Sequence, residues 1–231
     1  MKPKNLFLMV FILFLMPACK SPEGNIYKID PRTFVENKIT LDDLADDIIY
    51  IPLDNRYPIG QIYSSYKILK NSIYIAAQNI GIITFNRDGK MARKIGGFGR
   101  GPGEYLYCMS FAVDENTEAV YVMDRNNTIK VFSKNGNFLK SILLPKSEDG
   151  FNFSEIDFYY SNLFVSQYIN MGHAEYNWII IDTLGKLIKQ KKNSIPAFPS
   201  RGGNSGGICK FKNKIYYWNQ YNVPFSQFHL I

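Results

Sequence analysis

The feature that most constrains the fold of this chain is a short motif that occurs three times. Each copy is a run of β-branched and aromatic residues that leads into a turn with a glycine. The copies occupy residues 83–90, 130–137 and 179–186, and their glycines, Gly89, Gly136 and Gly185, follow one another after 47 and 49 residues. A fixed period of this size is typical of proteins built from repeated structural units. The sequence therefore predicts a repeat architecture.

A second motif precedes each turn and supports the same period. It is a three-residue apolar run that recurs at residues 73–75, 120–122, 163–165 and 215–217. Short β-branched and aromatic runs predict strands, because a helix would need an apolar stripe over ten or more residues. The best-preserved unit divides into four strands, at residues 109–113, 120–124, 128–132 and 138–143. This pattern predicts an all-β protein, a β-propeller whose blades are four-stranded antiparallel sheets.

The repeat also predicts how much of a propeller the chain contains. The same template gives an earlier unit at residues 61–96, a later one at 153–189, and the first half of another at 207–218. Residues 48–53 are expected to form one isolated strand before them. We therefore expect about three complete blades and a partial fourth within residues 31–222. Residues 223–231 fit no strand template and are predicted to be an anomalous tail.

The first residues indicate export from the cytoplasm. Lys2 and Lys4 precede the apolar run Leu6–Met16, which is followed by Pro17-Ala18-Cys19. This arrangement is typical of a secretory signal peptide, and the apolar run is short for a membrane span. The segment before Cys19 also resembles a lipobox, which implies cleavage after residue 18, lipidation of Cys19 and a tether over residues 19–30. Secretion without a lipid and an uncleaved anchor are the alternatives.

Charge and cysteine content limit the partners and cross-links of the chain. The formal net charge is +7, but most lysines are scattered among predicted turns, and the cluster at 189–192 is interpreted as a solvated strand end. Together with export, this predicts no nucleic-acid partner. Cys108 and Cys209 belong to units two repeats apart, whereas a disulfide needs Cα atoms within about 7 Å. We expect two free, mostly buried thiols.

The residues that join the first two units carry a family resemblance. The segment 98–105, Phe-Gly-Arg-Gly-Pro-Gly-Glu-Tyr, followed by 111–114, 120–124, 129–132 and Gly136, resembles an NHL repeat. With residues 47–53, the same order resembles the bacterial six-bladed β-propeller lipoproteins. The resemblance covers about residues 26–222 and implies a six-bladed ring on a membrane tether. Six such blades need roughly 280 residues, so the sequence predicts a truncated ring, with a four-bladed ring as the alternative.

Strand connectivity predicts which end of the blades could bind a ligand. In a four-stranded antiparallel blade, the turn between the second and third strands and the connection to the next blade lie at one end. The long segments 96–107, 125–127, 170–176 and 190–206 all fall there, whereas the other end has only short turns. Function concentrates in such loops because a rigid scaffold positions them. The candidate ligand-binding residues are Arg100, Glu104, Arg125, His173, Glu175 and Arg201.

Two of these candidates, and one strand-end carboxylate, also have a structural interpretation. Arg100 and Glu104 lie in a glycine-rich connection, where such side chains commonly satisfy the backbone of their own loop. Asp124 ends a predicted strand, so it is expected to bond its own turn rather than a metal. His173 is one of only two histidines, and no catalytic, metal-binding or cofactor-binding set can be assembled from the sequence.

The function that these features favour is binding rather than catalysis. We expect a membrane-tethered scaffold in the bacterial cell envelope, in the periplasm or on the outer-membrane surface, with a protein or glycan partner at the long-loop end. The alternative is a propeller hydrolase or lyase of the lactonase or NHL type, which would hold a divalent metal at the axis.

Overall fold

The structure is a computed structural model, and it describes residues 31–33, 35, 38–56, 59–60, 62–77, 79–125, 127–145, 153–167, 169–170, 172–193, 204–211, 214–219 and 227–230. The predicted signal peptide, Cys19, the tether and Arg201 lie outside these residues. The chain forms two compact units, Met1–Ile49 and Tyr50–Ile231. The first unit contains two short 3-10 helices, η1 (Pro31–Thr33) and η2 (Leu41–Asp43).

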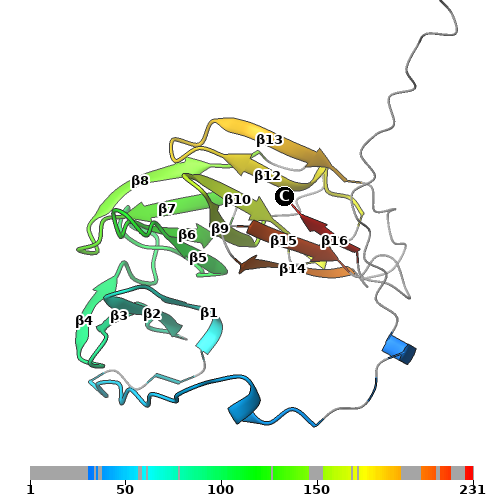
Figure 1. The fold of residues 1–231 in the computed structure, drawn as a ribbon. Helices are drawn as coiled ribbons and strands as arrows, with labels where there is room; N and C mark the ends of the chain where they lie inside the picture. Colours follow the sequence, from blue (N-terminus) through cyan, green and yellow to red (C-terminus); the bar gives the residue numbers. More distant parts are fainter. Residues whose placement is uncertain are drawn as a thin grey trace, which may run out of the picture. The chain divides into compact units, whose positions relative to one another are not determined.

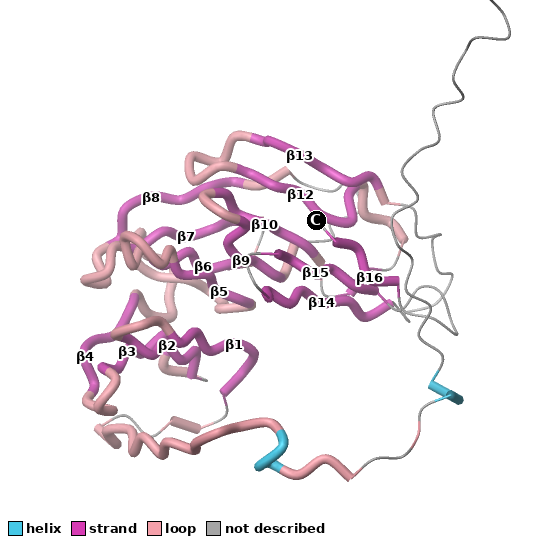
Figure 2. Tube along the Cα trace, viewed as in Figure 1, coloured by secondary structure: helices cyan, strands magenta, loops and turns pink. Residues whose placement is uncertain are grey.

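The second unit consists of four antiparallel sheets of four strands each, and Figure 2 shows its described residues as strands and loops. Blade 1 contains β1 (Ile62–Ile68), β2 (Ser72–Ala77), β3 (Gly81–Asn86) and β4 (Met91–Ile95); blade 2 contains β5 (Ser110–Val113), β6 (Val120–Asp124), β7 (Thr128–Phe132) and β8 (Phe138–Leu143). Blade 3 contains β9 (Glu155–Tyr159), β10 (Asn162–Ser166), β12 (Tyr176–Ile181) and β13 (Leu187–Lys192); blade 4 contains β11 (Ile169–Asn170), β14 (Asn204–Phe211), β15 (Lys214–Asn219) and β16 (Gln227–Leu230).

The sheets pack face to face around β1, β5, β9 and β14, as in a β-propeller. In Figure 1, β1, β5, β9 and β14 are the inner strands, and the fourth strands β4, β8 and β13 lie outermost. Each interface has its own apolar core: Ile82, Phe111 and Phe132 join blades 1 and 2, Ile129, Ile156 and Ile179 join blades 2 and 3, and Phe164, Ile180 and Tyr217 join blades 3 and 4. The second strands are buried on both faces, which explains their continuous apolar sequences. The predicted all-β propeller fold is confirmed.

The repeated glycine lets each hairpin between third and fourth strands approach the preceding blade. Gly136 has a φ of 84° and Gly185 a φ of 94°, a region that favours glycine. A Cβ at Gly136 would lie 2.7 Å from the carbonyl oxygen of Lys94 in β4, and one at Gly185 would lie 2.6 Å from Ile142 of β8. Two features therefore require glycine at these positions: the positive φ, and the close contact with the preceding blade.

The predicted isolated strand at residues 48–53 is wrong, because the structure assigns no strand there. Within the second unit, Ile51 and Leu53 instead pack on the outer face of blade 1, against a core that includes Phe85. The Asp54 amide donates to the Gly89 carbonyl (2.9 Å). Gly89 leaves no room for a Cβ beside Pro52. Residues 51–53 therefore contact the glycine of the blade 1 hairpin, in the same way that β4 contacts the glycine of the blade 2 hairpin.

Two further expectations are corrected by blade 4 and its cysteine. The strand β16 lies within residues 223–231, where no strand was predicted, and it pairs with β15. Both Cys108 and Cys209 are free, as predicted, but only Cys108 is buried. Cys209 is exposed because neighbouring residues in a strand face opposite ways, and Ile208 is the one that packs toward blade 3.

Candidate functional site

A buried tyrosine anchors the long loop that connects β4 to β5. Tyr105 has no exposed surface. Its hydroxyl donates to the carbonyl oxygen of Ile95 (3.1 Å) and accepts from the amide of Ile82 (3.0 Å). Its ring meets the rings of Phe98 and Phe132 edge to face, with centroids 5.4 and 6.1 Å apart. Burial raises the pKa of Tyr105, so the phenol stays neutral and keeps donating its proton.

The glycine-rich part of this loop is closed by its own residues. The Gly99 amide donates to the Tyr105 carbonyl (3.1 Å), and the Tyr105 amide donates to the Gly97 carbonyl (2.9 Å). The Glu104 carboxylate accepts the Gly101 amide (2.8 Å) and fills the space that a side chain at residue 99 would need. Glu104 therefore satisfies its own loop, as the structural interpretation of the sequence anticipated, while Arg100 is exposed.

One buried carboxylate joins this loop to the neighbouring turn. Asp124 is only 5% exposed, and its Oδ1 accepts the amides of Tyr107 (2.9 Å) and Arg125 (2.8 Å). The Arg125 guanidinium lies over the Tyr107 ring, with Cζ 5.0 Å from the ring centroid. Asp124 bonds its own turn, as predicted. The side chains of Tyr107 and Arg125 thus form a fixed pair at the surface.

The loop that carries Tyr107 also carries other exposed apolar residues. Phe98 is 38% exposed, Leu106 44% and Tyr107 37%. We call this set, Phe98, Arg100, Leu106, Tyr107 and Arg125, the long-loop surface. The sequence singled out Arg100 and Arg125 but not the apolar members. A single exposed tyrosine has no distinguishing pattern in one sequence, so Tyr107 could be found only through its contact with Arg125.

His173 and Glu175 lie between β11 and β12, within the described residues 172–175. Buried Asn170 holds this loop through its side-chain amide, which donates to the Oδ1 atoms of Asn177 (3.1 Å) and Asn193 (3.2 Å). Its own Oδ1 accepts the Gly172 amide (2.8 Å), and the Asn193 amide donates to the Glu175 carbonyl (2.9 Å). The side chains of His173 and Glu175 are exposed on this framework. Their predicted role in ligand binding stays a prediction.

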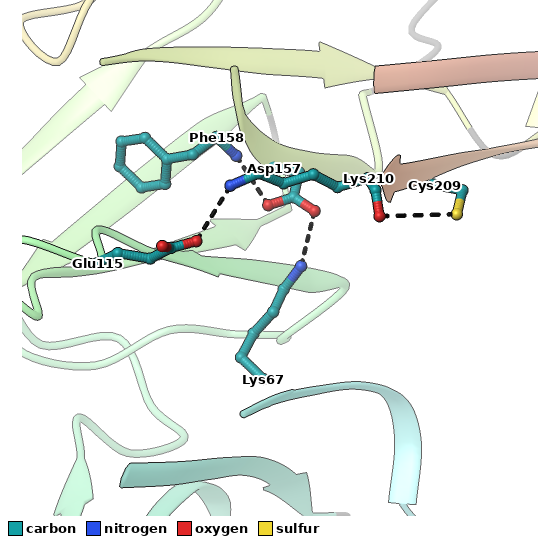
Figure 3. Close-up of polar contacts among 6 residues, drawn as sticks. All are labelled: Lys67, Glu115, Asp157, Phe158, Cys209 and Lys210. Atoms are coloured by element: carbon teal, nitrogen blue, oxygen red, sulfur yellow. Dashed lines mark hydrogen bonds and ion pairs between the residues drawn. The ribbon is translucent and has the colours of Figure 1, made fainter. Parts of the chain in front are cut away.

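The opposite end of the blades holds a charged pocket that the sequence did not predict. It has a volume of about 370 Å³ and is lined by Lys67, Ile68, Leu69, Val113, Glu115, Asp157 and Lys210. Figure 3 shows its two ion pairs: the Lys67 ammonium lies 2.8 Å from Asp157, and that of Lys210 lies 3.1 Å from Glu115. The first pair joins blades 1 and 3, and the second joins blades 4 and 2.

A signal for the first of these pairs exists in the repeat. Lys67 stands opposite Tyr74 and Asp157 opposite Phe164 in the strand registers, and both partners are the middle residues of the second repeated motif. The two charges therefore occupy equivalent places in their blades. Finding the pair from sequence requires the registers of the first strands, which the repeat alone does not give.

Glu155 lies two residues before Asp157 in β9, so the two side chains are on the same face of the strand. Burial raises the pKa of the Glu155 carboxyl to about 7, against the lowering effects of a hydrogen bond from Ser166 (3.4 Å) and of Lys67. The carboxyl is therefore partly protonated near neutral pH. Among the residues that the structure describes, no three His, Cys, Asp or Glu side chains are grouped so that they could hold a metal ion.

The comparison with protein families decides where the chain belongs. Residues 26–227 match the domain of unknown function DUF4934. The chain belongs to the DUF4934 family. The match covers all four blades of the second unit apart from the end of β16. Membership of an NHL-repeat or lipoprotein family is finer than this match and stays a prediction.

Comparison with solved structures finds proteins that share part of the fold of this DUF4934 protein. A protein of Bacteroides fragilis NCTC 9343 that is assigned as exported has a TM-score of 0.57 at 20% identity over 80% of this chain and 54% of its own. BamB of Moraxella catarrhalis (TM-score 0.45, 12% identity, 69% and 42% covered) and the β-propeller domain of Swd1 from Myceliophteria thermophila (0.44, 7%, 73% and 56%) are more distant. The chain spans about half the length of these proteins.

Two further comparisons add little to this placement of the DUF4934 protein. No curated protein matches the chain in sequence. In the described part of the chain, no helix is long and apolar enough to cross a membrane.

Proposed function

We propose that this DUF4934 protein is an extracytoplasmic binding scaffold, tethered to a membrane through Cys19, that holds a protein partner on its long-loop surface. The observation that carries the proposal is the Tyr107–Arg125 pair. Both backbone amides bond the same buried carboxylate of Asp124, while both side chains remain at the surface. The pair is therefore positioned before any partner arrives.

Such a surface fits the energetics of protein recognition. A few tyrosine, tryptophan and arginine residues supply most of the affinity of a typical interface. A side chain or loop that is already ordered loses less conformational entropy on binding, so more of the contact energy appears as affinity. The loop meets this condition through Tyr105, which has no exposed surface, and through the Glu104 bond to Gly101. Phe98 and Leu106 add exposed apolar area on the same loop as Tyr107, which favours a protein over a glycan.

The proposed location is supported by sequence and by likeness. The basic, apolar and small residues before Cys19 are typical of an exported lipoprotein. The Bacteroides fragilis protein that shares the fold is assigned as exported. A lipid on Cys19 followed by a tether would leave the propeller free to meet a partner in the envelope.

The test places a photo-crosslinking amino acid at position 107 of the full chain, produced in its native cell envelope. We expect a discrete protein adduct from this position. The yield of that adduct should fall by at least about tenfold when Arg125→Ala removes the cation over the ring. Mass spectrometry of the adduct identifies the partner.

The matched control carries the same photo-crosslinker at Tyr160, which is 67% exposed in the turn between β9 and β10. This position should give no adduct of that mass. Equal adducts from both positions, or an adduct at 107 that persists in Arg125→Ala, would contradict the proposal. An adduct that disappears after glycosidase treatment would assign the surface to a glycan instead.

A further inference from the structure

The outermost strands of blades 1 to 3 carry only positive charges. β4, β8 and β13 contain Arg93, Lys94, Lys140, Lys189, Lys191 and Lys192 and no acidic residue. The inner strand β9, in contrast, contains Glu155 and Asp157. The outermost strands are therefore basic, whereas the lysines of the inner strands β1 and β14 are paired with carboxylates.

Exposed aliphatic side chains accompany these lysines where blades 2 and 3 meet. Leu184 is 79% exposed at the tip of the hairpin between β12 and β13, and Ile188 and Leu187 follow it at 54% and 43%. The hairpin lies against β8, because the Lys140 ammonium donates to the Thr183 carbonyl (2.7 Å). Leu139, 57% exposed, is the neighbour of Lys140 in that strand.

We define the basic rim as Leu139, Leu184, Lys186, Leu187, Ile188 and Lys189, and we propose that it docks on the surface of an anionic phospholipid membrane. The proposal deepens the proposed function, because it rests on the tether that would bring the propeller near a membrane. Leu184 and Ile188 would enter the boundary between headgroups and acyl chains, while Lys186 and Lys189 would face the phosphates.

Charge complementarity favours this occupant. A lysine near an anionic membrane surface contributes about 1 kcal/mol, and exposed aliphatic residues add the apolar part of interfacial binding. The one acidic residue of the hairpin is Asp182, and its carboxylate accepts hydrogen bonds from the amides of Leu184 (2.9 Å) and Lys186 (2.8 Å). Lysines also protect edge strands from pairing with other chains, but that role does not account for a leucine that is 79% exposed at the hairpin tip.

The experiment measures hydrogen–deuterium exchange along the full chain carrying Cys19→Ser, which removes the lipid. Vesicles of phosphatidylcholine alone are compared with vesicles that also contain phosphatidylglycerol. We expect the apolar run Leu6–Met16, which this variant retains, to hold the chain to both kinds of vesicle, so that local exchange reports the rim. We expect exchange of residues 183–192 to slow by at least about twofold with the anionic vesicles only, and the effect to vanish in Leu184→Ser with Lys189→Glu.

Leu143→Ser is the matched control, because Leu143 is 67% exposed at the other end of β8 and lies outside the rim. This variant should keep the full effect. Equal slowing with both vesicle types, or no slowing with either, would overturn the proposal. Slowing that rises with protein concentration without vesicles would show that the rim contacts a second copy. The crosslink from position 107 is independent of this measurement, so the failure of one proposal does not imply failure of the other.

Discussion

The two ends of the blades use polar side chains in opposite ways. At the long-loop end, the carboxylates of Glu104 and Asp124 bond backbone amides of their own or a neighbouring loop. At the other end, Lys67 and Asp157 bond each other, across 90 residues of sequence. The first arrangement holds loops in place and leaves Arg100 and Arg125 exposed. The second arrangement joins two blades, and its opposite charges pair with each other.

This difference indicates which end is suited to binding. Charges that neutralise one another inside a pocket must be separated before a ligand can use them, which costs binding energy. Backbone bonds hold a loop without involving the exposed side chains it presents. The short-turn end is therefore expected to respond to mutation through stability, and the long-loop end through binding once its anchor is intact.

The largest expected effect comes from the anchor of the long loop. Tyr105→Ala removes a fully buried ring and should lower the free energy of unfolding by about 3–5 kcal/mol. Tyr105→Phe keeps the ring but leaves the Ile82 amide and the Ile95 carbonyl without their partner, at about 1–3 kcal/mol. Chemical denaturation followed by circular dichroism measures both losses. If Tyr105→Phe is as stable as the wild type, the hydroxyl does not anchor the loop.

The next effect concerns the ion pair between blades 1 and 3. Lys67→Met leaves the Asp157 side chain, which is 16% exposed, without its cation and should cost about 1–2 kcal/mol. The same denaturation series with Asp157→Asn and the double variant gives the coupling energy between the two residues. A coupling energy of zero would mean that this pair does not join the blades.

A pH-dependent effect follows from Glu155, which lies two residues before Asp157 in β9. Its pKa of about 7 in the folded protein exceeds the ordinary value of 4.5, so the folded state binds more protons than the unfolded state between these values. Stability from this group is complete below pH 4.5 and is lost as the pH rises through 7. Glu155→Gln stays neutral and should be more stable than the wild type by about 1–2 kcal/mol at pH 8.

The control for Glu155→Gln is the same comparison at low pH. At pH 4.5 the two proteins should unfold at nearly the same denaturant concentration, since the Glu155 carboxyl is then neutral in the folded state and half protonated in the unfolded state. A stability difference that does not change between pH 4.5 and pH 8 would show that the carboxyl does not ionise in this range.

The smallest expected effect is that of the second ion pair. Glu115 is 67% exposed and Lys210 31% exposed, and such surface pairs contribute about 0–0.5 kcal/mol. Lys210→Met should therefore change the unfolding midpoint little in comparison with Lys67→Met. If Lys210→Met lowered stability as much as Lys67→Met, the two ion pairs would contribute equally to holding the blades together.

The strands that the sequence predicted well are those whose pattern is local. Residues 120–124, 128–132 and 138–143 match β6, β7 and β8 because the motif, the turn and the alternation all lie within one hairpin. The two-residue strand β11 could not be predicted, since its partner Ser205 in β14 is 36 residues away. Residues 48–53 have the composition of a strand but pack by their side chains on blade 1.

The residues of the candidate site also differ in whether their contacts are local in the sequence. Glu104 and Asp124 were interpretable from sequence because their partners are at most a few residues away or in the same turn. The pairing of Tyr107 with Arg125 depends on two loops meeting above Asp124. The axial pair of Lys67 and Asp157 depends on two first strands that approach only when the sheets assemble. Neither meeting leaves a local pattern.

The most direct test of binding at the long-loop end measures the affinity of the partner captured from position 107, using biolayer interferometry on the purified full chain. We expect Tyr107→Ala to raise the Kd at least about tenfold. Tyr160→Ala, which alters a more exposed tyrosine at the other end of the blades, should leave the Kd unchanged. An unchanged Kd for Tyr107→Ala, or an equal rise for both variants, would contradict the claim that the long-loop end is the binding end.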